Sequence, residues 1–135
     1  MISQKIIKIA LNTKYSGLDN FFTHKSAIKN SLCGDRIKIQ VIANNTRINS
    51  MRYETESCVL CEASASLLAK KIKNYSLKNF KKDIKLLKKS IKDRKSTLPS
   101  KFKEFKFFLT KDNANRVNCV ILPLDALIKA FKLKI

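Results

Sequence analysis

Three cysteines that lie far apart in the sequence stand in contexts suited to metal binding. Cys33 begins the tripeptide Cys33-Gly34-Asp35, Cys58 follows a Glu-Ser pair, and Cys119 follows an asparagine. Thiolate sulfur is the soft ligand that binds zinc, iron and iron–sulfur clusters. Asp35 adds a carboxylate oxygen within reach of the same loop. The residue types therefore predict a metal or cluster site formed by Cys33, Asp35, Cys58 and Cys119.

The first half of the chain changes from a helical to a strand pattern. Apolar residues at helical spacing predict a helix over residues 2–12. Residues 13–35 are mixed and mostly irregular, with a short strand at 25–29. Residues 36–43 and 46–55 alternate apolar and polar side chains on either side of an Asn-Asn turn, which predicts an antiparallel hairpin. The sheet should therefore have about three strands.

The second half of the chain returns to helical spacing. The predicted helices span residues 59–74, 77–92, 101–109 and 121–134. Ser76 is the expected N-cap of the second of these helices, and Pro123 falls in the first turn of the last one, where proline is tolerated. The order of helix, strands and helices predicts an α+β fold, in which a small antiparallel sheet packs against helices.

The predicted elements should bring the candidate ligands together. Cys58 and Cys119 each directly precede a predicted helix, so the positive end of a helix dipole should lower the pKa of each thiol. Gly34 allows a tight turn that aims Cys33 and Asp35 at one point. We expect the three loop ends to converge at one edge of the sheet in a single exposed site. Three thiolates and a weaker carboxylate ligand would let this site both bind and release a metal or cluster.

The length and composition are those of a folded domain with its own core. The chain has 135 residues, of which 44% are hydrophobic, and we expect residues 1–135 to form a single domain. A chain of this size does not need disulfides, although its four cysteines could form two of them in three connectivities. The sequence shows no signal peptide and no membrane-spanning apolar run. We therefore expect a cytoplasmic location, where thiols stay reduced.

The formal net charge of +19 comes from 29 basic and 10 acidic residues. Such a charge raises the question of nucleic acid or anionic lipid as a partner. Lys far outnumbers Arg, whereas bidentate recognition of phosphate and guanine favours Arg. We therefore expect no membrane binding and no specific nucleic-acid binding, and a basic nucleic-acid-binding module remains a remote alternative. An acidic protein partner is a third interpretation.

Several other residues that could do chemistry are better explained by structure. Cys61, one turn into a predicted helix, could be half of a redox pair or zinc site, but its position favours a packed thiol. His24, the single histidine, could be a fourth ligand, but a structural loop role is favoured. The helical spacing of Phe102, Phe105 and Phe108 favours core packing over the stacking of bases.

The cysteine motifs, taken in order, resemble those of the iron–sulfur cluster assembly scaffold family, which includes the IscU/SufU proteins and the N-terminal domain of NifU. The resemblance runs from roughly residue 3 to the C-terminus. The tripeptide at 33–35 matches the first Cys-Gly-Asp of the family, and residues 52–58 resemble the segment that leads to its second cysteine. Residues 63–68 resemble the small-residue helix that follows, and residues 118–127 resemble the third cysteine and its helix. Three motifs in order, at suitable intervals, make the match specific.

The resemblance implies a function in iron–sulfur cluster assembly. Members of this family accept sulfur from a cysteine desulfurase, assemble or relay it with iron, and donate the product to a downstream Fe–S carrier or apo-protein acceptor. By this match, Cys33, Asp35, Cys58 and Cys119 would bind a transient iron–sulfur cluster, of the [2Fe-2S] type, or zinc. The persulfide would be received by Cys119, as in IscU-like members, or by Cys33, as in SufU-like members. The implied role is that of a scaffold and sulfur acceptor rather than a turnover enzyme.

The sequence departs from the family pattern at several positions. Asn118 stands where IscU-like proteins have a histidine, and Ser57 replaces the usual glycine before the second cysteine. Residues 112–117 replace the Leu-Pro-Pro-Val-Lys motif that a dedicated Hsp70 chaperone binds, which argues against that partner. The interval between Cys58 and Cys119 is long, as in SufU-like members, which are zinc-binding sulfur-relay proteins. The chain thus leans towards the SufU-like type, and a zinc-dependent persulfide relay is an alternative to a cluster scaffold.

Overall fold

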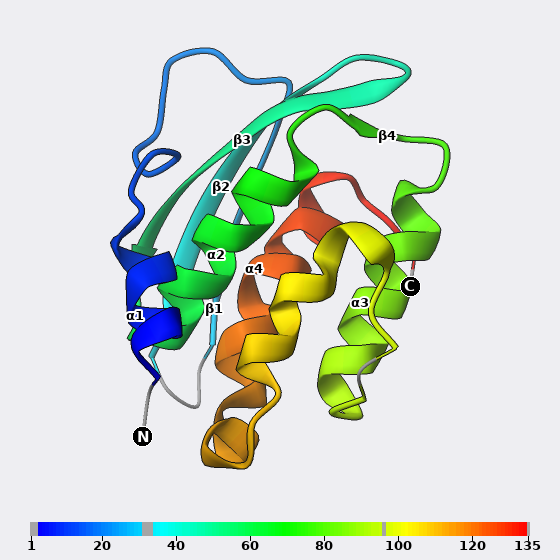
Figure 1. Cartoon of the computed structure of the whole chain (residues 1–135). Coiled ribbons are helices and arrows are strands. Elements are labelled where there is room, and N and C mark those ends of the chain that lie inside the picture. The colour runs from blue at the N-terminus through cyan, green and yellow to red at the C-terminus, as the bar shows by residue number, and fades with distance from the viewer. Residues whose placement is uncertain (1–2, 31–33, 96, 135) are drawn as a thin grey trace.

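The structure, a computed structural model, describes residues 3–30, 34–95 and 97–134 and shows a sheet covered by helices (Figure 1). Its elements are, in order, α1 (Gln4–Leu11), β1 (His24–Lys29), β2 (Arg36–Ala43), β3 (Arg47–Glu56), α2 (Val59–Ile72), β4 (Tyr75–Ser76), α3 (Phe80–Lys92), η1 (Ser100–Phe108), η2 (Lys111–Arg116) and α4 (Val117–Ala130). The order of helix, strands and helices confirms the predicted α+β fold. Within the described residues, no helix has both the length and the apolar character needed to cross a membrane.

The strands form one antiparallel sheet in the order β1-β2-β3-β4. Strands β2 and β3 make the predicted hairpin, in which Ile39 lies opposite Tyr53 and Val41 lies opposite Met51. These four side chains are buried, and the residues that alternate with them are more exposed. The alternation gives the sheet one apolar face and one polar face. Strand β1 confirms the short strand predicted at 25–29.

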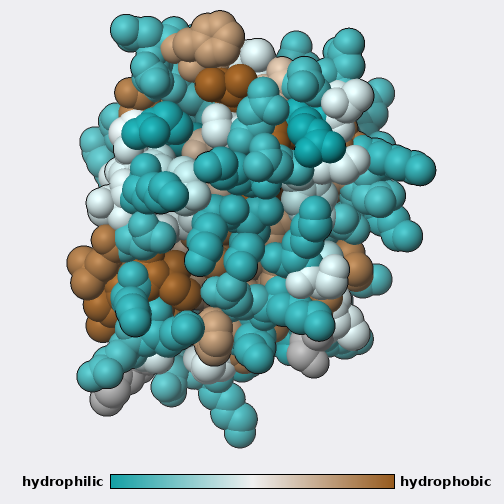
Figure 2. All heavy atoms as spheres, turned by 45° about the horizontal axis from the view of Figure 1, so that its top comes forward, coloured by the Kyte–Doolittle hydropathy of each residue, from teal (hydrophilic) through white to brown (hydrophobic). Residues whose placement is uncertain are grey.

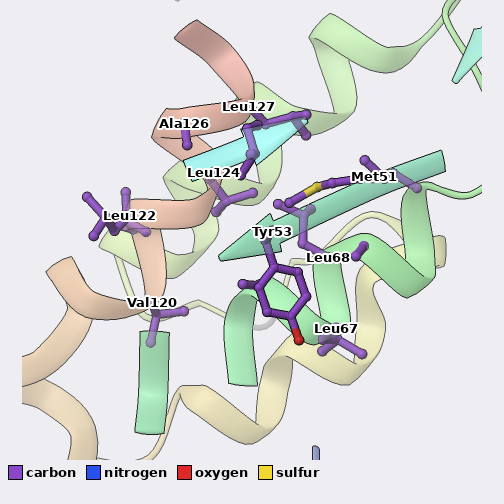
Figure 3. Close-up of a cluster of buried hydrophobic side chains, with 14 of the residues drawn as sticks. Met51, Tyr53, Leu67, Leu68, Val120, Leu122, Leu124, Ala126 and Leu127 are labelled. Carbon is purple, nitrogen blue, oxygen red and sulfur yellow. The ribbon is translucent and has the colours of Figure 1, made fainter. Parts of the chain in front are cut away.

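Helices α2 and α4 lie next to each other on the apolar face of the sheet, α2 against β3 and α4 against β1 and β2 (Figure 1). Figure 3 shows side chains from β3, α2 and α4 that meet in this layer, among them Met51, Tyr53, Leu67, Leu68, Val120, Leu124 and Leu127. Helix α2 is buried on nearly all sides because α1, α4 and the sheet all pack against it. Its small residues at 63–66 allow these neighbours to approach closely.

The peripheral helices follow the sequence patterns that predicted them. Helix α1 begins after Ser3, whose side-chain oxygen accepts a hydrogen bond from the backbone N–H of Ile6. Segment η1 is 3-10 helical with a kink at Phe102, and its three-residue spacing brings Phe102, Phe105 and Phe108 to the core. All three rings are buried, which confirms that they belong to the core.

The strand β4 was not predicted, because two residues are too few to show an alternating pattern. It pairs with the start of β3 and extends the sheet to four strands. Ser76 lies in this strand, so its predicted role as the N-cap of α3 is wrong, and Asn79 occupies that position. The Ser76 hydroxyl instead accepts a hydrogen bond from the backbone N–H of Lys78 in the turn before the helix.

Helix α4 begins at Val117, four residues before the predicted start, so Pro123 lies inside the helix rather than in its first turn. A proline inside a helix cannot donate a hydrogen bond to the carbonyl four residues earlier, here that of Cys119. Burial of most of α4 between α2, α3 and the sheet offsets this cost. The earlier start places Cys119 in the first turn of α4, whereas the sequence predicted it just before the helix.

Strand β1 forms one edge of the sheet. The C-terminal part of α4 is attached to this strand by two hydrogen bonds. The Ser26 hydroxyl donates to the carbonyl of Ala126 at 2.6 Å, and Lys129 Nζ donates to the carbonyl of Ala27 at 3.0 Å. A lysine therefore covers part of the sheet edge.

Candidate metal centre

Backbone hydrogen bonds with Asn30 hold Asp35 at the beginning of β2. Its carbonyl accepts a hydrogen bond from the N–H of Asn30 at 2.7 Å, and the N–H of Gly34 donates to the carbonyl of Asn30 at 2.8 Å. Gly34 has a φ of 74°, in the left-handed region where glycine is favoured. The Asp35 side chain lies inward, and only 5% of the residue is exposed.

Cys58 reaches the same end of the sheet from the neighbouring strand. Arg36 at the start of β2 pairs with Glu56 at the end of β3, and Cys58 follows two residues later as the N-cap of α2. The backbone N–H of Cys58 donates to Asp35 Oδ1 at 3.2 Å. The Asp35 carboxylate therefore satisfies an amide at the start of the helix and fixes the position of Cys58 relative to β2.

Cys119 is brought to this place by the packing of α4 against α2. The Ser64 hydroxyl of α2 donates to the carbonyl of Val120 at 2.6 Å in the buried interface between the helices. This bond fixes the first turn of α4, with Cys119, beside the first turns of α2. Cys119 is 7% exposed, and Cys58 is partly exposed, so the site opens to solvent on the side of Cys58.

One ligand atom from each of Asp35, Cys58 and Cys119 lies within 4.8 Å of the other two. In a tetrahedral zinc site, two thiolate ligands lie about 3.8 Å apart, so a small contraction would bring these atoms to bonding distance of one ion. Asp35 Oδ2 is buried and has no hydrogen-bond partner among the described residues. A buried carboxylate oxygen without a partner is costly unless a cation or donor satisfies it. The donor set and this oxygen both fit a bound cation.

Burial raises the pKa of the Cys119 thiol well above its usual value, and the neighbouring Cys58 and Asp35 side chains raise it further. The prediction that the helix dipole lowers this pKa is therefore wrong for Cys119 in the metal-free protein. The sequence indicates the helix start but not the depth of burial, and burial has the larger effect here. A metal that binds Cys119 must displace its proton.

The other candidate ligands fall outside this group. Cys33 lies outside the described residues, so its predicted place in the site remains a prediction. Cys61 is buried in the apolar core, as expected for a packed thiol. His24 is the first residue of β1 rather than part of a loop, and its ring stacks on Phe131 with 4.4 Å between the ring centroids. This packing agrees with the structural role favoured over a ligand, although the predicted place in a loop is wrong.

The hydrogen bond between the Cys58 amide and Asp35 was not predicted from the sequence. It joins residues that are 23 positions apart, and no local pattern indicates such a pair. The same holds for Ser64, which the sequence shows only as one of several small residues. The cysteine motifs were thus the only local signal for this site.

The fold and the order of the cysteine motifs are those of the iron–sulfur cluster assembly scaffold family. The family model of the NifU-like N-terminal domain matches residues 1–120, and the chain belongs to this family. Members of this scaffold family bind iron–sulfur clusters. The family predicted from the motifs is confirmed.

Proteins similar to this chain are found both by sequence and by structure. An uncharacterized protein of Borreliella burgdorferi is 28% identical over 126 residues, which cover 93% of this chain and 79% of that protein. The crystal structure of a nitrogen-fixing NifU-like protein (N-terminal) from Brucella abortus has a TM-score of 0.85 at 18% identity and covers 96% of this chain and 91% of its own. A protein from Fervidobacterium islandicum AW-1, assigned as an iron–sulfur cluster assembly scaffold for the SUF system, has a TM-score of 0.82 at 20% identity, with coverage of 95% and 94%. At these identities, the two structures show the shared fold.

Proposed function

We propose that this protein receives sulfur from a cysteine desulfurase and holds a transient iron–sulfur cluster, or the metal for it, until transfer to a carrier or apo-protein. The ligands would be Cys33, Asp35, Cys58 and Cys119. The observation that supports this proposal is the convergence of Asp35, Cys58 and Cys119 from three separate elements within 4.8 Å. Soft thiolates and one buried carboxylate are the donors that iron and zinc accept.

The transfer of sulfur would occur by exchange between thiols. Once the thiol of Cys119 or Cys33 has lost its proton, the thiolate attacks the terminal sulfur of the persulfide on the desulfurase, a new S–S bond forms, and the desulfurase cysteine leaves as a thiolate. One sulfur atom moves, and no external oxidant is needed. Cys119 lies next to the other two ligands, so a sulfur received there would already be at the place of cluster assembly.

The combination of thiolate ligands with one carboxylate explains how the site could also release the bound cluster or metal. A carboxylate oxygen is a harder and weaker ligand for iron than a fourth thiolate would be. Cys58 is partly exposed, which leaves one side of the site accessible to an acceptor. The protein would thus act as a scaffold and sulfur acceptor, working as a single domain in a reducing cytoplasm with no dedicated Hsp70.

A second candidate is a zinc-dependent persulfide relay. The specific observation in its favour is the size of the site, since three ligand atoms within 4.8 Å need only a small contraction to bind one ion. In that case zinc would stay bound, and the persulfide would pass through a cysteine that leaves the metal during each cycle.

Anaerobic reconstitution tests both candidates. The protein is mixed with iron, L-cysteine, a cysteine desulfurase and dithiothreitol, a thiol reductant that converts persulfide sulfur to sulfide, and the visible absorption of an iron–sulfur cluster is recorded with metal analysis. A cluster on the wild type that is lost in Cys58→Ser and Cys119→Ser supports the scaffold. Cys61→Ser is the matched control, because Cys61 lies outside the ligand group, and it should keep the cluster.

The outcomes distinguish the two candidates. Tightly bound zinc, a stimulated desulfurase and no cluster would support the relay instead. A wild-type protein that takes up neither iron nor zinc would contradict both proposals.

A further inference from the structure

Helix α3 carries six lysines on one face, here called the lysine stripe: Lys81, Lys82, Lys85, Lys88, Lys89 and Lys92. At 100° per residue, these positions cover an arc of about 120° along the whole helix. The opposite face of α3 is buried and apolar. Five of the six lysines are exposed, and Lys88 is half-buried.

The stripe is not neutralised within the molecule. Lys88 Nζ forms an ion pair with Asp125 of α4 at 2.7 Å. Within the described residues, none of the other five lysines has a carboxylate within ion-pair distance. The single acidic residue of the helix, Asp83, accepts a hydrogen bond from the Tyr75 hydroxyl on another side of α3.

This arrangement opposes the local stability of the helix. Like charges three or four residues apart destabilise a helix, and the stripe has such spacings throughout. Glutamates placed between the lysines would give favourable pairs, but α3 has none. A feature that conflicts with local stability is expected where a function requires it.

The C-terminal end of the stripe lies at the same end of the molecule as the candidate metal centre. Helices α3 and α4 run antiparallel in contact, and the pair Lys88–Asp125 fixes their relative position (Figure 1). Cys119 is six residues before Asp125, or about 9 Å along α4. Lys92 is four residues after Lys88, or about 6 Å along α3 in the same direction. The C-terminal end of the stripe is therefore at the same end of the molecule as Cys119.

We propose that the lysine stripe is the surface on which an acidic face of the sulfur-donating protein docks, an inference that rests on the proposed function. Its charge is complementary to carboxylates, and a donor bound at its C-terminal end would lie at the same end of the molecule as Cys119. The stripe contains no arginine, the residue preferred for phosphate recognition, which favours a protein over a nucleic acid. Leu86, which is 39% exposed, borders the stripe and adds the apolar contact that protein interfaces use.

Binding of the full-length protein to a cysteine desulfurase from the same organism tests this inference. The stripe variant Lys81→Glu/Lys85→Glu/Lys89→Glu is compared with the wild type by titration calorimetry at several salt concentrations. The control variant, Lys38→Glu/Lys103→Glu/Lys111→Glu, has the same net charge, but its exposed positions lie on β2, η1 and η2. We expect the stripe variant to bind at least about tenfold more weakly, with a smaller dependence on salt, and the control to stay within about threefold. Circular dichroism and zinc binding confirm that both variants fold.

The outcomes of this binding experiment can be separated from those of the reconstitution that tests the proposed function. Equal losses of desulfurase binding in both variants would show that only net charge matters, and this would overturn the inference. No binding by the wild type would also overturn it. Loss of affinity for an RNA oligonucleotide with unchanged affinity for the desulfurase would assign the stripe to nucleic acid instead. Metal and cluster uptake, measured separately on the wild type, tests the proposed function whatever the stripe does.

Discussion

At the scale of single residues, Asp35 connects the fold to the candidate metal centre. One of its carboxylate oxygens accepts the hydrogen bond from the Cys58 amide, and the other is buried without a partner among the described residues. The first oxygen holds the start of α2 in place. The second is available to a metal, so a single side chain positions one ligand and supplies another.

Replacement of Asp35 by alanine should slow the release of a bound cluster. The substitution removes the hardest and weakest of the four proposed ligands, which we infer to be the one that allows transfer. Release is followed by the decay of cluster absorption after an apo-ferredoxin is added under anaerobic conditions.

The matched control for this experiment is Glu56→Ala, which removes an exposed carboxylate at the same end of the sheet. It should leave the rate of release unchanged. If Asp35→Ala released its cluster at the wild-type rate, the proposed role of Asp35 in transfer would be wrong.

The residue types of the site could be predicted from the sequence, but their environment could not. The Cys-Gly-Asp tripeptide and the two later cysteines are local signals. The burial of Cys119 and the bond from the Cys58 amide to Asp35 depend on how α2, α4 and β2 pack. For this reason the direction of the pKa shift at Cys119 was predicted incorrectly.

At the scale of elements, the strongly periodic segments could be predicted and the short or interrupted ones could not. Helix α2 and the β2–β3 hairpin lie within two residues of their expected bounds. Strand β4 is too short to have a period, and it exists because the edge of β3 offers hydrogen bonds. Helix α4 continues past Pro123 because its surroundings bury it, and single-residue propensities do not contain this information.

The ion pair between α2 and η1 should give a small, pH-dependent contribution to stability. The hydrogen bond from Lys71 lowers the pKa of Glu104 below its usual value of 4.5, and burial partly opposes this. Because the folded protein has the lower pKa, the contribution is present above the unfolded pKa and is lost as the pH falls through the folded pKa. Since both side chains are partly exposed, we expect less than about 1 kcal/mol.

Chemical denaturation of Glu104→Gln at neutral pH and at about pH 3 measures this contribution. The free energy of unfolding should fall below that of the wild type at neutral pH, and the difference should shrink in acid. In a Lys71→Gln background the same substitution should have little effect at either pH. A difference that grows as the pH falls would contradict the assignment.

At the scale of the whole molecule, basic side chains far outnumber the carboxylates that could form ion pairs with them. The chain has 29 basic and 10 acidic residues, and hydrophilic side chains cover most of the face seen in Figure 2. Hydrophobic surface gathers at the left of that view, the side on which α1 lies in Figure 1 and where Ile7 and Leu11 are exposed. The excess of lysine and its concentration in the segment that forms α3 could be read from the sequence. The fold was required to show that the C-terminal end of α3 lies at the same end of the molecule as Cys119.

Added salt should stabilise the folded protein. With a net charge of +19, repulsion among like charges opposes compaction, and the Debye length falls to about 10 Å at 0.1 M ionic strength. We expect the midpoint of unfolding by urea, an uncharged denaturant, to rise as sodium chloride is increased from about 0.02 to 0.3 M.

A variant with Lys81, Lys85 and Lys89 changed to glutamine is the control for the salt experiment, since it removes three of the repelling charges. Its urea midpoint should start higher at low salt and should respond less to sodium chloride. A wild-type midpoint that decreases with salt would mean that favourable ion pairs outweigh repulsion.

The bond from Lys129 to the carbonyl of Ala27 has a consequence for behaviour at high concentration. An incoming strand from another copy would have to displace this ammonium group and bring its own cations next to Lys25 and Lys29, which are exposed on β1. Growth of fibrils through this strand is therefore blocked both by an occupied acceptor and by repulsion.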